Sequence, residues 1–206
     1  MIKIVDYGLG NILAFQNMYK RLNVDVGVAR TAGELADASR IILPGVGAFD
    51  HAMKLLDASG MHPTLDELVL ERRVPVLGIC VGMQILARAS DEGRLGGLGW
   101  IDARVRSFST LENEDLLLPH MGWNDVHPVT QTALFEGLRP EGRFYFLHSY
   151  FFECEREQDV AARTTYGVDF ACSVQAGNIY GVQFHPEKSH HFGAQLLKNF
   201  ADLPTC

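Results

Sequence analysis

Apolar and polar positions follow two different patterns along this chain, and the change falls near residue 90. Before that point, short apolar runs alternate with segments whose apolar residues recur every three or four positions, the period of a helix. The predicted strands are 2–5, 24–29, 41–43 and 76–79, and the predicted helices are 11–22, a short one from Thr31, 49–56 and 63–71. Such alternation indicates a parallel sheet covered by helices on both faces.

Beyond residue 90 the pattern favours strands. It predicts strands at 100–108, 122–126, 143–153, 160–165, 170–175 and 179–184, a hairpin turn at 176–178 and a final helix at 192–200. No repeat, linker or low-complexity tract separates the two parts, so we expect a single domain spanning residues 1–206. We predict an α/β three-layer sandwich whose central sheet is parallel first and mixed later.

Composition narrows the classes of function. Among 206 residues, 47% are hydrophobic and 21% are charged, which is typical of a folded globular chain. The net charge of -7 would repel phosphate backbones and anionic lipid, so we expect neither a nucleic acid nor a membrane surface as partner. The apolar run 2–5 meets Asp6 too soon for a signal peptide, and no run is long enough to span a bilayer. A cytoplasmic location is the expectation.

One of the four cysteines lies in a segment typical of nucleophiles. An apolar run enters Gly78, Cys80 follows, Gly82 comes next, and a helical segment starts at once. A Cβ at either flanking position would collide with neighbouring strands in so tight a turn. The helix N-terminus would favour a thiolate and offer backbone N–H groups to an oxyanion. The alternative is a buried structural cysteine. The other cysteines lack this context and show no CxxC spacing, so we expect no metal; they are Cys154, Cys172 and Cys206.

A second candidate lies at residues 183–187. Pro186 disfavours the helical region for His185, which should therefore be extended. In an extended chain, residues two apart point the same way, so His185 and Glu187 can share one face. This would give a general base and the carboxylate that orients it. An ordinary ion pair at a strand end is the alternative.

Glycines mark a third candidate at the end of the strand 41–43. Gly45 and Gly47 flank Val46 and let the backbone turn its N–H groups toward a ligand, as an oxyanion hole requires, although an ordinary turn would look the same. Another glycine-rich segment, 6–11, lacks the third glycine and the acidic residue of a dinucleotide-binding loop. No cofactor is expected.

Together, the cysteine turn, the downstream His-x-Glu and the glycine-rich strand end resemble the class I glutamine amidotransferases, over almost the whole chain. The segments 6–11, 44–47, 119–124 and 148–150 resemble one branch of that family, the glutaminase subunits of imidazole glycerol phosphate synthase, a histidine-biosynthesis enzyme. The resemblance implies a flavodoxin-like α/β fold and the hydrolysis of glutamine to glutamate and ammonia.

The resemblance also implies a role for each matching residue. Cys80 would attack the glutamine carboxamide, His185 would carry the proton to the departing ammonia, and Glu187 would orient His185. The oxyanion would be held by Val46, Gly47 and Val81; glutamine would be bound by Gly45, Gln84, His148, Ser149 and Tyr150; a partner would be met by Asn11, Met121, Trp123 and Lys188. For His148 and Tyr150 the alternative is core packing, and for Trp123 it is a half-buried aromatic.

In the resembled branch, ammonia passes to a separate (β/α)8-barrel cyclase subunit that makes imidazole glycerol phosphate and AICAR. A barrel of about 250 residues does not fit in this chain, so the resemblance implies a heterodimer. A paralogous glutaminase could instead serve another synthase, such as one that amidinates a cell-surface sugar.

Two further alternatives are a related Cys-His hydrolase of peptides and a non-catalytic binding subunit. Gln84 and the glycine-rich strand end argue against the first, and the intact Cys80, His185 and Glu187 argue against the second. The pair His190 and His191 has no assigned role.

Overall fold

The structure is a computed structural model that describes residues 1–111, 116–138 and 142–204, so Cys206 lies outside the described residues. Strands of the first half, joined by one late strand, form the parallel part of a sheet. They are β1 (Ile2–Val5), β2 (Val26–Ala29), β3 (Arg40–Gly45), β4 (Val76–Cys80) and β12 (Ile179–Val182), in the order β2-β1-β3-β4-β12. The central strands β4 and β12 are buried along their whole length, as parallel strands between two helical layers are.

The sheet continues into strands that are mostly antiparallel. They are β5 (Ala89–Ser90), β6 (Ala103–Ser107), β7 (His120–Pro128), β8 (Gly142–His148), β9 (Tyr150–Cys154), β10 (Val160–Tyr166) and β11 (Val168–Ala176). The row runs β12-β11-β10-β7-β8, while β9 pairs with both β11 and β6, and β6 also pairs with β5. Fully buried phenylalanines, among them Phe144, Phe146 and Phe170, fill the core of this part.

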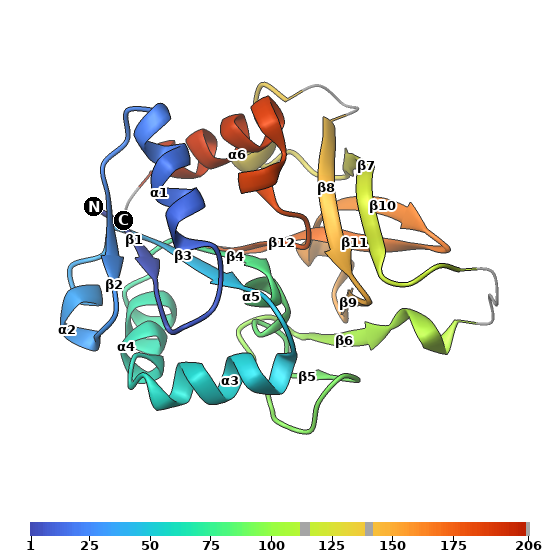
Figure 1. Cartoon of the computed structure of the whole chain (residues 1–206), viewed down its shortest axis with the longest axis horizontal. Coiled ribbons are helices and arrows are strands. Elements are labelled where there is room, and N and C mark those ends of the chain that lie inside the picture. The colour runs from blue at the N-terminus through green and yellow to red at the C-terminus, as the bar shows by residue number, and fades with distance from the viewer. Residues whose placement is uncertain (112–115, 139–141, 205–206) are drawn as a thin grey trace.

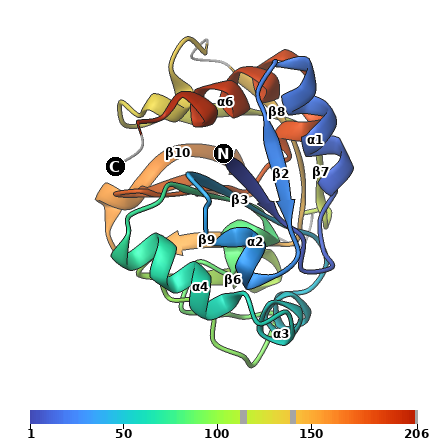
Figure 2. The ribbon, with the colours of Figure 1, turned by 90° about the vertical axis from the view of Figure 1, so that its left-hand side faces the viewer.

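Helices cover both faces of the parallel part (Figures 1 and 2). On one face lie α1 (Ile12–Arg21) and α6 (His190–Asp202); on the other lie α2 (Ala32–Leu35), α3 (Phe49–Ala58) and α4 (His62–Asp66), which continues as a π-helical turn Glu67–Glu71. A single turn, α5 (Val81–Gln84), follows β4 directly. None of the described helices has the length and apolar character needed to span a membrane.

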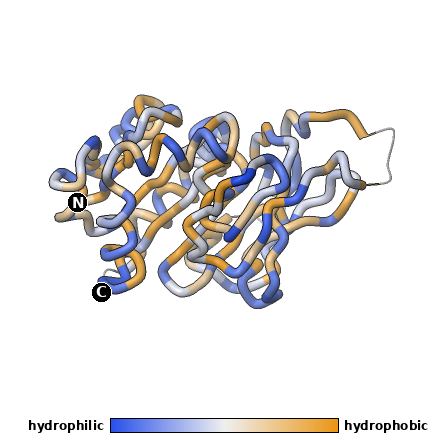
Figure 3. Tube along the Cα trace, turned by 90° about the horizontal axis from the view of Figure 1, so that it is seen from below, coloured by the Kyte–Doolittle hydropathy of each residue, from blue (hydrophilic) through white to orange (hydrophobic). Residues whose placement is uncertain are grey.

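Apolar and polar positions alternate along both parts of the chain, as the hydropathy-coloured trace shows (Figure 3). In α1, for example, the buried positions are Phe15, Met18 and Tyr19, at the spacing of one helical face. The prediction of a central sheet, parallel first and mixed later and flanked by helices, is confirmed.

The structure differs from the prediction at the segment 143–153, which was expected to be one strand. It is broken at Ser149 into β8 and β9 because its two parts have different neighbours. His148 pairs with His120 of β7, whereas Tyr150 pairs with Ser107 of β6. Hydrophobic alternation carries no signal for such a change of partner. The break places Ser149 and Tyr150 at the cavity described next.

Candidate active site

Cys80 lies on a sharp turn between β4 and α5. Its φ of 55° and ψ of -114° are a strained conformation for a residue with a side chain. A Cβ added to Gly82 would lie 1.9 Å from the carbonyl oxygen of Leu43, and one on Gly78 would lie 2.5 Å from the carbonyl oxygen of Gly82. The glycines therefore let the turn press against its own strand and against β3, which is the steric reason expected from the sequence.

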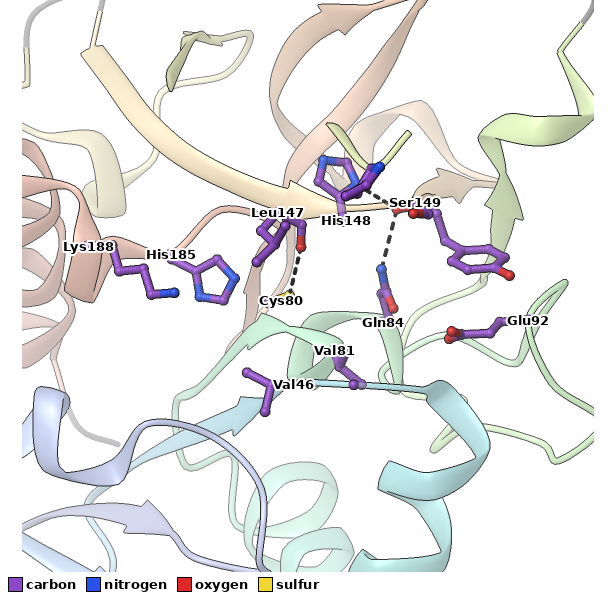
Figure 4. Close-up of a pocket in the computed structure, with 13 residues that line it drawn as sticks. Val46, Cys80, Val81, Gln84, Glu92, Leu147, His148, Ser149, His185 and Lys188 are labelled. Carbon is purple, nitrogen blue, oxygen red and sulfur yellow. Dashed lines mark hydrogen bonds between the residues drawn. The ribbon is translucent and has the colours of Figure 1, made fainter. Parts of the chain in front are cut away.

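A cavity of about 280 Å³ opens above Cys80 (Figure 4). Ten residues singled out from the sequence line it together: Val46, Gly47, Cys80, Val81, Gln84, His148, Ser149, Tyr150, His185 and Lys188. Three more residues line it: Pro119, which belongs to the segment 119–124 but was given no role, and Glu92 and Leu147, which sequence reasoning missed. The remaining candidates lie outside its lining: Asn11, Gly45, Met121, Trp123 and Glu187. Segments that are far apart in the chain thus converge on one thiol.

His185 is held by a buried carboxylate. Its Nδ1 lies 2.9 Å from Oε1 of Glu187, and the two side chains are only 4% and 3% exposed. Burial alone would lower the pKa of His185, but contacts with Cys80 and Glu187 outweigh it and raise the pKa to about 10. His185 is therefore an imidazolium at neutral pH.

The local geometry behind this contact differs from the prediction. His185 itself is extended, with φ -104° and ψ 93°, but Pro186–Lys188 form a 3-10 turn. Glu187 therefore reaches the imidazole from within a turn, and the expectation that the two residues share one face of an extended strand was wrong. Proline favours the first position of a helical turn because it lacks an N–H and its φ is already suitable.

The glycine-rich end of β3 packs directly against the cysteine turn. A Cβ on Gly45 would lie 2.5 Å from the backbone nitrogen of Gly82, so Gly45 serves close packing. Gly47 has a φ of 91°, which favours glycine, and Val46 between them is 42% exposed at the cavity. Pro44 precedes Gly45, and its carbonyl oxygen accepts a hydrogen bond of 2.8 Å from the buried hydroxyl of Tyr7.

Two buried amide side chains lie near the thiol. Gln84 Nε2 donates to Gln183 Oε1 at 3.0 Å and lies 3.4 Å from the carbonyl oxygen of Tyr150. Gln183 Nε2 in turn lies 3.8 Å from Cys80 Sγ. Sequence reasoning included Gln183 in the segment 183–187 but gave it no role. It missed Glu92, whose carboxylate accepts from the backbone N–H of Phe49 at 2.8 Å and which no motif marks.

Exposed apolar side chains lie on the strand beside the cavity. Met121 is 65% exposed and faces Leu147, a cavity residue, across β7 and β8. Trp123 is 40% exposed and stacks on the ring of His190 at 5.0 Å. His190, to which the sequence gave no role, thus packs against this indole.

The other two expected partner residues are also exposed. Lys188 places its Nζ 5.6 Å above the ring of Tyr145, and Asn11 caps α1 by accepting from Ala14 N at 3.2 Å. Among the residues that the structure describes, no group of three or more His, Cys, Asp or Glu side chains could hold a metal ion.

Comparisons with known proteins agree with this geometry. The family model described as glutamine amidotransferase class-I matches residues 3–203. The chain is 62% identical over 204 residues to the imidazole glycerol phosphate synthase subunit HisH of Bdellovibrio bacteriovorus, with 98% of this chain and 100% of that protein covered. It is 50% identical to the protein of the same name from Leptospira interrogans, again with 98% and 100% covered.

Solved structures show the same fold. A crystal structure described as a glutamine amidotransferase superposes with a TM-score of 0.75 at 21% identity, covering 97% of this chain and 96% of that one. A glutamine amidotransferase from Thermotoga maritima gives a TM-score of 0.63 at 18% identity, covering 98% and 82%. This chain belongs to the class-I glutamine amidotransferase family.

Proposed function

We propose that the chain is the glutaminase subunit of an imidazole glycerol phosphate synthase, and that Cys80, His185 and Glu187 are its catalytic triad. The observation that carries the proposal is the strained Cys80, which shares a cavity with a buried His185–Glu187 ion pair. The names of the relatives that match over their full length support the choice of synthase over one that modifies a surface sugar.

The reaction follows from the charges around the thiol. The imidazolium of His185 stabilises negative charge on Cys80 Sγ, which attacks the side-chain carboxamide carbon of glutamine. His185 gives its proton to the nitrogen, ammonia leaves, and a γ-glutamyl thioester remains. Water then attacks the thioester, passes its proton back to His185 and releases glutamate. Glu187 keeps the ring oriented and favours its charged form.

Negative charge that develops on the carboxamide oxygen needs donors that are already in place. Val81 is the first residue of α5, so its N–H points out of the helix start and has no partner within the helix. We assign it as one donor, and the N–H groups of Val46 and Gly47 as the other side of the hole. One such donor contributes about 10² to 10³ in kcat.

The amino-acid end of glutamine would lie toward β9. There the cavity is lined by Gln84, Ser149 and Tyr150, and by the carboxylate of Glu92. Glu92 is a suitable counter-charge for the α-ammonium group, because a carboxylate hydrogen bond to a cation is about twice as strong as a neutral one. Gly45, which sequence reasoning placed in this group, lies outside the cavity lining and packs against Gly82.

The released ammonia requires an acceptor on another chain. We assign the acceptor to a (β/α)8-barrel cyclase that docks over the exposed Met121 and Trp123, with Asn11 and Lys188 at the edges of the contact. Exposed apolar side chains next to a catalytic cavity are typical of a docking surface. A cytoplasmic location belongs to the same proposal, since a phosphorylated acceptor cannot cross a membrane unaided.

The test is to assay glutamine-dependent and ammonium-dependent synthesis by the purified complex. Cys80→Ala should lower glutamine-dependent turnover by about 10⁴-fold or more, because the nucleophile is lost. It should leave ammonium-dependent turnover intact, because that chemistry lies in the partner. Cys154→Ala, which removes a thiol that burial keeps protonated, is the matched control and should change neither. Loss of both activities in an assembled Cys80→Ala complex would contradict the division of labour.

Docking should also control the rate. Val46 lies between two glycines, so its peptide plane can rotate, and the partner can set the orientation that completes the oxyanion hole. We expect kcat for glutamate release to rise by about 10² to 10³ when the partner and an acceptor analogue are added. Equal kcat for the free glutaminase, the complex and the acceptor-bound complex would contradict this, as would a change in KM alone.

A further inference from the structure

Two buried histidines lie directly opposite each other on β7 and β8. His120 and His148 are 3% and 6% exposed, and they are a register pair of the two strands. Nδ1 of His120 lies 2.9 Å from Nε2 of His148, and Nδ1 of His148 lies 2.7 Å from the carbonyl oxygen of Tyr150. The His120 ring stacks on Tyr166 and on Phe146, at centroid distances of 4.0 and 4.8 Å, so its plane is fixed.

The hydrogen-bond partners determine where each proton lies. A carbonyl oxygen only accepts, so Nδ1 of His148 carries a hydrogen, and Nε2 of the neutral ring accepts from Nδ1 of His120. Nε2 of His120 is then an acceptor, and the Asn124 amide lies 3.3 Å away to donate to it while also donating to the carbonyl oxygen of Thr165 at 3.0 Å. One tautomer on each ring satisfies every contact.

A proton added to the pair would break this arrangement. An imidazolium at His148 would place two N–H donors face to face at 2.9 Å. Burial lowers the pKa of His148 to about 3 and that of His120 to about 4, and the nearby His185 charge acts on His148 in the same direction. Both rings are therefore neutral at the pH at which His185 is charged.

The chain of hydrogen bonds leads to the cavity. The Tyr150 carbonyl that receives the His148 proton also lies 3.4 Å from the Gln84 amide. Gln84 donates to Gln183, and Gln183 approaches the Cys80 sulfur at 3.8 Å. His120 does not line the cavity, and both ring nitrogens of His148 are occupied inside the protein.

We propose that His120 and His148 form a neutral pair with fixed tautomers that orients the Tyr150 carbonyl and, through it, the amide of Gln84, so that the cavity binds the amino-acid end of glutamine. The inference rests on the proposed function for its ligand. His120 is a positioning residue, and His148 acts through Tyr150 and Gln84 as well.

Substitutions at His120 separate the hydrogen bond from the bulk of the ring. His120→Leu leaves Nε2 of His148 without its donor, and we expect KM for glutamine to rise by about 10-fold with a smaller change in kcat. His120→Asn can place an amide N–H near the former Nδ1 and should recover most of the loss. His191→Leu, at an exposed histidine of α6, is the control and should change neither constant. An unchanged KM in folded His120→Leu would overturn the proposal.

A second measurement does not depend on folding of the variants or on turnover. Nitrogen NMR of the ¹⁵N-labelled wild-type protein should find both rings neutral from pH 8 to 5.5, each with its hydrogen on Nδ1. A hydrogen on Nε2 of His148, or protonation of either ring above pH 6, would overturn the pair. Absence of glutamate release by the wild-type complex would instead reject the proposed function and leave this tautomer assignment standing.

Discussion

The two walls of the cavity are built by different means. The first wall, made by the ends of β3 and β4 with α5, consists of close backbone contacts, in which Gly45, Gly78 and Gly82 have no room for a Cβ. The second wall, made by β8, β9 and the segment after β12 and backed by β7, consists of buried polar side chains at hydrogen-bond distance from one another and from Gln84 of α5. The first wall places the sulfur atom and the backbone N–H groups of the proposed oxyanion hole, and the second places polar side chains and charge around the sulfur.

The second wall shows how strongly neighbours decide the state of a histidine. His185 and His148 line the same cavity, and burial lowers the pKa of each. Contacts with Cys80 and with the Glu187 carboxylate then raise the pKa of His185, whereas a carbonyl and a second histidine surround His148. We expect isosteric changes in the second wall to alter activity while the fold is retained. Changes in the first wall should alter both.

Within the second wall, the largest expected effect is that of Glu187→Gln on turnover. The variant keeps the shape of the side chain but removes its charge, so His185 is poorly oriented and less readily protonated. We expect kcat to fall by about 10² to 10⁴, less than for Cys80→Ala, with the fold retained by circular dichroism. Glu153→Gln, at a half-exposed carboxylate of β9, is the control. A Glu187→Gln enzyme at the wild-type rate would exclude Glu187 from the proposed triad.

The Glu187→Gln variant should also change how the free energy of unfolding depends on pH. The pKa of His185 is raised from 6.5 to about 10 in the folded protein, so between these values the folded state holds a proton that the unfolded state has lost. The free energy of unfolding should therefore decrease as pH rises through this window, by at most about 1.4 kcal/mol per pH unit. Urea titrations at several pH values should show a shallower decrease in Glu187→Gln, and equal slopes would contradict the assigned ion pair.

The next effect tests the first wall. In Gly82→Ala the new methyl group would lie 1.9 Å from the carbonyl oxygen of Leu43, which belongs to backbone and cannot move aside cheaply. We expect a loss of about 3 kcal/mol or more in the free energy of unfolding, together with loss of glutaminase activity. Gly33→Ala, where nothing lies within 4 Å, is the matched control and should be neutral or slightly stabilising. A stable, active Gly82→Ala would show that the first wall is more tolerant than its contacts indicate.

The smallest expected effect concerns Tyr7, which donates a hydrogen bond to the backbone of the first wall. Tyr7→Phe removes the hydroxyl that donates to the Pro44 carbonyl, so we expect a loss of about 1 to 2 kcal/mol, measured by urea unfolding. Tyr19→Phe is a sharp control, since the fully buried Tyr19 hydroxyl has no partner among the residues that the structure describes. Removing it should cost nothing. A larger loss for Tyr19→Phe than for Tyr7→Phe would reverse our view of which hydroxyl stabilises the fold.

Sequence reasoning reaches the first wall better than the second. The sequence signal for the tight turn at Cys80 lies within five positions of it, and the signal for the parallel strands is local periodicity, so both can be predicted. The partner change at Ser149 depends on strands β6 and β7, and the bond between Gln84 and Gln183 joins residues 99 apart. Local patterns of apolar and polar residues do not indicate contacts between residues so far apart in the sequence. The 3-10 turn at Glu187 was missed because the effect of Pro186 on the residue before it was extended to the residue after it.

The two tryptophans allow association with a partner to be followed by intrinsic fluorescence. Trp100 is buried, with its indole nitrogen donating to Asp66 at 2.7 Å, so its surroundings are constant. Trp123 lies at the surface against His190, where a docking chain would displace water from the indole. Any change in the tryptophan fluorescence of this chain on assembly should therefore arise from Trp123. Association with the partner can be followed in real time without a dye, at concentrations where turnover is also measured.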